Sequence, residues 1–140
     1  MRQEYSIKGL PEPLSHYCDA VRSDNLLFVS GVVGIDEKNE IVPGGVLAQT
    51  EQIFRNYEKI FAAVGGGVGF KDVLKVTLFL MDVGDRTRIN PIRQKYFGGA
   101  RPASTLIGVK ELALPELLIE IEAVVALPDT ATSMLASPSH

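Results

Sequence analysis

The stretch LAQTEQIFRNYEKIFAAV, Leu47 to Val64, decides the fold class of this chain. Its apolar residues recur at spacings of three and four, which is typical of an amphipathic helix with one face toward a core. The members of this stripe are Leu47, Thr50, Ile53, Phe54, Tyr57, Ile60, Phe61 and Val64. GGGVG follows at 65–69, and since glycine favours helix ends, we expect it to end the helix rather than to cradle a phosphate.

Strand patterns flank this helix on both sides. Before it, LLFVSGVVGI (26–35) is rich in β-forming residues, and Gly31 and Gly34 are expected to break the strand or to let another backbone come close. After it, VLKVTLFLM (73–81) is almost continuously apolar, which predicts a strand buried on both faces. Further strands are expected at 4–8, 17–22, 103–109 and 117–127, and a second helix at 86–97 with Pro91 in its first turns.

This order of elements predicts an α+β fold, in which one mixed sheet carries two helices on one face. The other face then needs a cover, and we expect copies of the chain to associate and bury it. The length of 140 residues suits one domain, which we place at 1–128, with a disordered tail at 129–140.

Composition excludes several classes of partner. The formal net charge is −3 and Lys and Arg form no run, which argues against nucleic acid. Lys75, Glu120 and Glu122 interrupt the apolar runs well short of the roughly 20 residues that a membrane span needs. The first residues lack an apolar signal core, and the one cysteine, Cys18, reads as a small buried hydrophobe, so a reducing cytoplasm is expected. No metal-ligand, nucleotide or triad motif occurs, so we predict no metal and no cofactor.

LLIEIEAVVAL, 117–127, is the most informative pattern for chemistry. On a strand, Glu120 and Glu122 point to the same face, about 6.5 to 7 Å apart, while Ile119 and Ile121 face the other way. One interpretation is a solvated or salt-bridged face. The other is that one carboxylate lines a cleft, where desolvation raises its pKa and lets it hold a water or carry a proton.

Other polar residues leave alternatives open. Ser30 and Gly31 could present a hydroxyl and a free N–H to a carboxylate ligand, or form a simple bulge. Asn90, beside a proline, could merely cap the second helix. The arginines of that helix, Arg93 among them, are most simply solvated, and His16 reads as a surface residue.

Six blocks in order resemble the RidA/YjgF family, also called the liver perchloric-acid-soluble protein family. The blocks are SHYCDAV (15–21), LLFVSGVVGID (26–36), AQTEQIFRNYEKIFAAVG (48–65), DVLKVTLFLMDVGDRTRINPIRQKYF (72–97), RPASTLIGV (101–109) and LLIEIEAVVAL (117–127). The resemblance implies a chorismate-mutase-like fold and a homotrimer with a small-molecule cleft between each pair of subunits. It also implies hydrolysis of reactive enamines and imines, such as 2-aminoacrylate, to 2-oxo acids and ammonia without metal or cofactor.

The same resemblance implies roles for individual residues. Glu120 would position the attacking water, with Tyr17 as the second catalytic residue. The residues expected to contact substrate are Ser30, Gly31, Asn90, Arg101, Ser104 and Thr105. Ser104 stands where deaminating members carry an arginine that binds the substrate carboxylate. A serine offers one neutral hydrogen bond, so we expect a less anionic ligand unless Arg101 compensates.

Three functions are compatible with these patterns. The first is a divergent hydrolase or deaminase of a small enamine, imine or related metabolite. The second is a trimeric small-molecule-binding protein that has lost the chemistry. The third is a ribonuclease or translation inhibitor, as some members of the family are, which the acidic charge disfavours.

Overall fold

In the computed structural model, which describes residues 1–128, six strands form one sheet in the order β1-β2-β3-β6-β4-β5. The strands are β1 (Arg2–Tyr5), β2 (Ala20–Ser23), β3 (Leu26–Val33), β4 (Val73–Leu80), β5 (Ala103–Gly108) and β6 (Ile119–Ala126). The helices are α1 (Gly45–Val64) and α2 (Arg86–Phe97), with short 3-10 turns η1 (Phe70–Asp72) and η2 (Val83–Asp85). The predicted tail at 129–140 lies outside the described residues.

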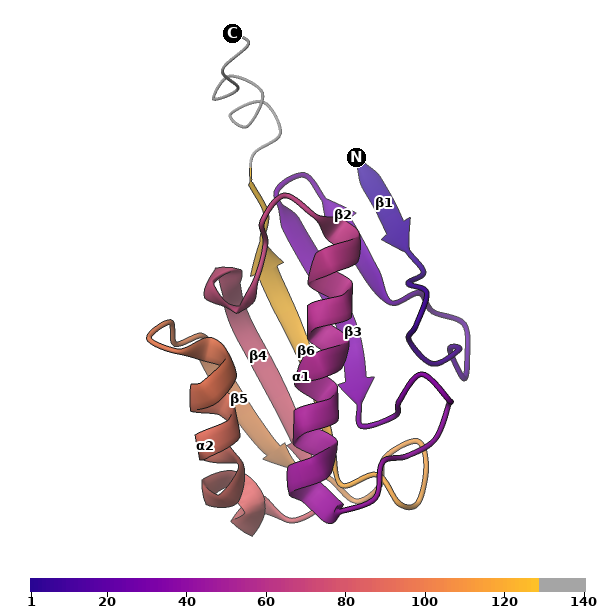
Figure 1. Ribbon diagram of the computed structural model, residues 1–140, viewed down its shortest axis with the longest axis vertical. Coiled ribbons are helices and arrows are strands. Elements are labelled where there is room, and N and C mark those ends of the chain that lie inside the picture. The colour runs from indigo at the N-terminus through magenta and orange to yellow at the C-terminus, as the bar shows by residue number, and fades with distance from the viewer. Residues whose placement is uncertain (129–140) are drawn as a thin grey trace, which may run out of the picture.

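The sheet is mixed, and both helices cover one of its faces (Figure 1). β4 and β5 are parallel and are joined through α2, while every other neighbouring pair is antiparallel. The α+β architecture with two helices on one face, expected from the order of elements, is confirmed.

The apolar stripe of α1 forms the centre of the core. Ile53, Phe54, Tyr57 and Ile60 are buried there, and the hydroxyl of Tyr57 donates to the Ile121 carbonyl of β6 at 2.8 Å. This bond fastens the helix to the strand that carries the two glutamates. Glycine ends the helix as predicted, since residue 65 has a φ of 78°, in the left-handed region.

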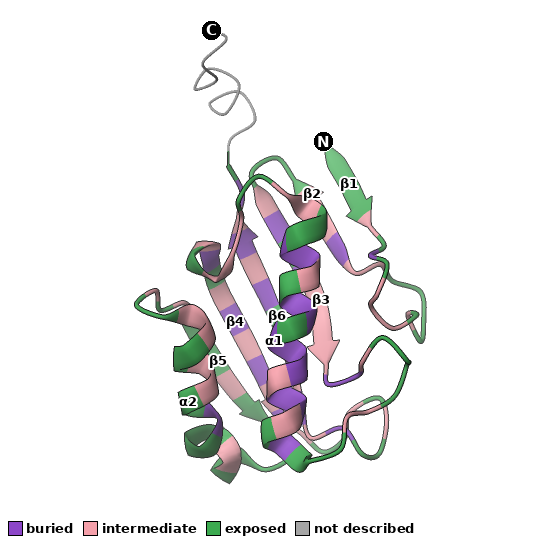
Figure 2. Cartoon of the chain, viewed as in Figure 1, coloured by how far each residue is buried: buried purple, intermediate pink, exposed green. Residues whose placement is uncertain are grey.

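The open face of the sheet differs from its helix-covered face. Along β4, Val76, Leu78 and Leu80 are buried under the helices, while Thr77 and Phe79 are only half-buried (Figure 2). Within one chain the helices bury one face of β4 only, and burial of its other face stays a prediction that depends on association.

The first two strands are shorter and shifted relative to the prediction. β1 and β2 pair from Arg2 with Ser23 to Tyr5 with Ala20. The chain between Tyr5 and Ala20 forms a loop instead of continuing the two strands. In that loop, the Asp19 carboxylate accepts from the backbone N–H of Ile7 at 2.7 Å. Later in the chain, α2 begins as predicted, but Asn90 lies inside it, so a capping role for Asn90 is wrong.

Candidate functional site

A β-bulge in β3 places the first group of predicted site residues. The register against β6 shifts between Val29 and Val32, and Ser30 and Gly31 occupy the shift. The Ser30 hydroxyl donates to the Cys18 carbonyl at 2.7 Å, which ties the bulge to the preceding loop. The bulge alternative is thus confirmed, and the strand continues beyond it to Val33.

Gly31 leaves room for the side chain of Glu120. A Cβ built on Gly31 would lie 2.7 Å from the Glu120 Cδ, closer than carbon atoms approach in proteins. Glu120 is half-buried and forms no hydrogen bond or ion pair with any residue in the described range 1–128. Burial raises the pKa of its carboxyl, and the negative charge of Glu122 raises it further.

The two glutamates share one face of β6, as predicted. Their neighbours Ile119 and Ile121 are buried on the opposite, helix-covered face. Glu122 is exposed, whereas Glu120 is half-buried against the bulge. Glu122 therefore fits the interpretation of a carboxylate on a solvated face. Glu120 fits the interpretation of a carboxylate whose pKa desolvation raises.

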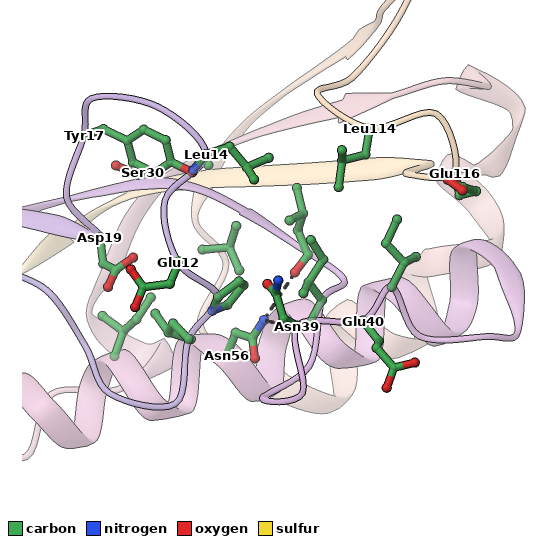
Figure 3. Close-up of a pocket in the computed structure, with 18 residues that line it drawn as sticks. Glu12, Leu14, Tyr17, Asp19, Ser30, Asn39, Glu40, Asn56, Leu114 and Glu116 are labelled. Atoms are coloured by element: carbon green, nitrogen blue, oxygen red, sulfur yellow. Dashed lines mark hydrogen bonds between the residues drawn. The ribbon is translucent and has the colours of Figure 1, made fainter.

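A cavity of about 410 Å³ lies beside the bulge, between the loop that follows β1, the turn after β3 and α1 (Figure 3). Tyr17, Ser30 and Gly31 line it, and the Tyr17 hydroxyl accepts from the Leu14 backbone N–H at 3.3 Å. Its acidic lining residues are Glu12, Asp19, Glu40 and Glu116. No Lys or Arg among the described residues lines the cavity, so it favours a neutral or cationic group over an anion.

Burial also affects an acid in this cavity. Desolvation raises the pKa of Asp19, although the hydrogen bond from Ile7 opposes it. Glu120 is not among the lining residues, but its carboxylate touches Gly31, which is. Gly31 therefore lies between the cavity and the carboxyl group of Glu120.

The second group of predicted site residues lies at or near β5, an edge strand of the sheet. β6 and β4 separate β3 from β5, which corresponds to three strand spacings, or roughly 14 Å. Asn90 is exposed on α2, and Arg101 is exposed just before β5. Within one chain, neither is brought to the bulge.

Ser104 and Thr105 point to opposite faces of β5. The Ser104 hydroxyl faces α2 and accepts from Nη2 of Arg93 at 3.1 Å. The Thr105 hydroxyl faces the open side of the sheet and accepts from Nζ of Lys75 at 3.1 Å. Successive side chains of a strand alternate between faces, so within one chain the two hydroxyls point to opposite sides of the sheet, and their contact with substrate stays a prediction.

Arg93 is the residue at this edge that sequence reasoning missed. The prediction of a solvated side chain is wrong, because Arg93 is half-buried and desolvation lowers the pKa of its guanidinium. Its spacing of three residues from Asn90 places both on one helix face, and this was the available signal.

Other features of residues 1–128 concern metals and membranes. They contain no group of three or more His, Cys, Asp or Glu side chains able to hold a metal ion. None of the helices in this range is long and apolar enough to cross a membrane. His16 is exposed, as expected for a surface residue, and Cys18 is half-buried with its thiol near the Ala20 carbonyl.

Comparison with known families agrees with this arrangement. The model of the family described as "Endoribonuclease L-PSP" matches residues 8–127. The chain belongs to the endoribonuclease L-PSP family. The RidA of an Antarctic Psychrobacter has a similar structure, with a TM-score of 0.81 and 28% sequence identity over 89% of this chain and 99% of that one. The resemblance to the RidA/YjgF family is thereby confirmed.

Several L-PSP family relatives are named as deaminases. The 3-aminoacrylate deaminase RutC of Acinetobacter baylyi is 37% identical, covering 84% of this chain and 91% of the relative. The 2-iminobutanoate/2-iminopropanoate deaminase of Mus musculus is 35% identical, covering 89% of this chain and 90% of the relative. These names support a general deaminase or hydrolase interpretation.

Proposed function

We propose that this chain is a cofactor-independent deaminase of a small enamine or imine, in which Glu120 positions the attacking water. The observation that carries the proposal is the state of Glu120: a half-buried carboxyl, without a partner in the described range, whose pKa burial raises. A carboxyl group whose pKa lies above its ordinary value holds a proton more readily, which suits a group that first accepts and then returns a proton.

The proposed reaction is hydrolysis of a C=N bond. The imine nitrogen first takes a proton from solvent. The Glu120 carboxylate then accepts a proton from water as the water oxygen bonds to the iminium carbon and the electron pair of the C=N π bond moves to nitrogen. Glu120 returns its proton to the nitrogen of the resulting carbinolamine. The C–N bond then breaks as the hydroxyl oxygen forms the C=O bond and gives up its proton to the Glu120 carboxylate, which passes it to solvent. Ammonia and a 2-oxo compound leave, and no electrons are transferred. Tyr17, at the cavity mouth, is proposed to contact the substrate.

The active assembly is proposed to be a homotrimer with a cleft at each subunit boundary. Glu120 points to the open face of β6, whereas Ser104 lies on the helix-covered face of β5, two strands away, and Asn90 lies on α2. A second copy is therefore proposed to bring such residues to Glu120. The open face also carries exposed apolar side chains, including Phe28 at 45% and Ile107 at 42% exposure. Association would cover this apolar surface.

The test is a coupled assay in which 2-aminoacrylate is generated in place and pyruvate and ammonia release are timed. We expect the wild type to accelerate release and Glu120→Ala to lower the rate about 10²- to 10⁴-fold, the usual contribution of a general acid–base group. Glu122→Gln is the matched variant, two residues along the same face. Glu122→Gln should retain turnover. The acidic limb of its pH–rate profile should move to lower pH, because the negative charge that raises the pKa of Glu120 is gone.

Two outcomes would contradict the proposal. Unchanged turnover in Glu120→Ala would remove the assigned role from Glu120. A wild type that does not accelerate release, yet binds 2-oxobutanoate, would favour the small-molecule-binding alternative. The ribonuclease hypothesis gains no support from the cavity, since four carboxylates there would repel a phosphate backbone.

A further inference from the structure

The cavity beside the bulge has the size and the fixed walls of a small-molecule site. Its volume of about 410 Å³ lies within the roughly 300 to 1,000 Å³ of ligand pockets. Two of its walls are fastened to α1. The Asn56 amide donates to the carbonyls of Val33 and Ile35 at 3.2 and 2.9 Å. Nζ of Lys59 donates to the Gly9 carbonyl, in the loop after β1, at 3.1 Å. Walls that are held in place before binding lower the entropic cost of taking up a ligand.

Most of this cavity lies apart from the carboxyl group of Glu120. Glu120 points to the open face of β6 and does not line the cavity, whereas Ile60 of α1 lines it from the helix-covered side. Tyr17, Ser30 and Gly31 are the lining residues that also belong to the site proposed for imine hydrolysis. A ligand held against α1 therefore occupies a different place from an imine at Glu120.

Carboxylates lie at two ends of the cavity (Figure 3). Glu12 and Asp19 lie together at one end, where the negative charge of Glu12 acts on Asp19, and Glu40 and Glu116 lie toward the other end. Within residues 1–128, the side chains of Glu12, Glu40 and Glu116 make no hydrogen bond or ion pair. Since no Lys or Arg of the described range lines the cavity, both ends favour a cation.

The lining between these two ends is apolar. Leu14 and Leu114 lie between the two pairs of carboxylates in Figure 3, and Ile60 also lines the cavity. Such a lining stabilises CH₂ groups by removing them from water, but it offers nothing to a charged group. The complementary ligand is therefore an apolar chain with a positive charge at each end.

We propose that this cavity binds an aliphatic diamine, with one ammonium group at Glu12 and Asp19, the other toward Glu40 and Glu116, and the CH₂ chain between them. Alkyl ammonium groups, like that of lysine, stay charged at neutral pH. A monoamine would leave one pair of carboxylates without a cation. An amino acid would bring a carboxylate, which the acidic lining repels. This site is additional to the proposed hydrolysis and does not depend on it.

The experiment is calorimetric titration of the full chain with 1,5-diaminopentane and three matched compounds. 1-Aminopentane should bind roughly 10- to 100-fold more weakly, the usual effect of losing a charge-assisted hydrogen bond. 1,5-Pentanediol, which has the same chain without charge, should bind more weakly still. L-Lysine carries the same two amines and one added carboxylate, and it should also bind more weakly than 1,5-diaminopentane.

A double variant removes the charge at one end of the cavity. Glu12→Gln combined with Asp19→Asn should lower the affinity for 1,5-diaminopentane to about that of the wild type for 1-aminopentane. The amide that replaces the Asp19 carboxylate can still accept from the Ile7 N–H, which preserves the loop contact. Glu111→Gln is the control, because Glu111 is an exposed carboxylate that does not line the cavity. It should bind like the wild type.

Methyl NMR spectra of the wild type locate the bound diamine. The signals of Leu14 and Leu114 should shift on titration, while that of Leu74, exposed on β4 outside the cavity, should not. Equal affinity for 1,5-diaminopentane and 1,5-pentanediol would overturn the proposal, as would no binding of the diamine or shifts confined to Leu74. Should the double variant not fold, the order of affinities of the wild type for the four compounds decides. Because the readout is binding, it is unaffected if hydrolysis at Glu120 fails.

Discussion

Substituting Gly31 with alanine tests how the bulge and Glu120 fit together. The three atoms nearest to a Cβ at this position all belong to the Glu120 side chain, with Cδ at 2.7 Å and Cγ at 2.9 Å. Gly31 is not among the glycines with positive φ, so backbone strain adds nothing to the effect. Overpacking of this kind costs about 1 to 3 kcal/mol, and we expect Gly31→Ala to lower the free energy of unfolding by that amount.

The effect should disappear when Glu120 is shortened. Glu120→Ala removes all three of the contacting atoms, so in that background Gly31→Ala should be neutral or should stabilise by up to about 1 kcal/mol through the unfolded chain. The coupling energy between the two sites is then about 1 to 3 kcal/mol or slightly more. Urea unfolding of the four proteins of this cycle measures it, at one fixed protein concentration because association changes apparent stability.

Gly34→Ala supplies the matched control for this cycle. A Cβ there would lie 2.7 Å from the Cα of Gln49, on the backbone of α1, and would meet no atom of Glu120. Its cost should therefore be the same with and without the Glu120 side chain. If Gly31→Ala is equally costly in both backgrounds, the close packing of Gly31 against Glu120 is not what limits this position.

Two further changes test the surroundings of the site. Tyr57→Phe should lower the free energy of unfolding by about 1 to 3 kcal/mol, because the buried Ile121 carbonyl loses its 2.8 Å donor; a change in urea midpoint close to zero would contradict this. Glu120→Gln should gain stability relative to the wild type as pH rises above the ordinary carboxyl pKa. The raised pKa means that the carboxyl stabilises the fold while protonated and loses this contribution on ionising. Urea unfolding of both proteins at acidic and neutral pH checks the sign. A wild type that gains stability relative to Glu120→Gln as pH rises would refute the reasoning.

Local patterns predicted the elements well. The stripe from Leu47 to Val64 predicted α1, and the alternation around Glu120 and Glu122 predicted their shared face, because both signals come from the geometry of one helix or one strand. The apolar run of β4 indicated two buried faces, and within one chain the helices bury only one of them. Burial on the second face depends on what covers the sheet, which a single strand does not encode.

Residues of the candidate site show where prediction from sequence ends. The pattern IEIE identified two carboxylates of equal chemistry, and only packing distinguishes them: Gly31 lies against Glu120, while Glu122 faces solvent. Ser104 and Thr105 are neighbours in the chain, yet the strand directs one toward Arg93 of α2 and the other toward β4.

The chain's own periodicity and turn residues were thus sufficient for the fold class, the two helices and the face on which Glu120 lies. The desolvation of Glu120, the pairing of Arg93 with Ser104 and the distance between the two groups of site residues came from the folded chain alone. The physical reason is range: periodicity is a property of consecutive residues, whereas desolvation and hydrogen bonding depend on atoms that folding brings together from distant segments.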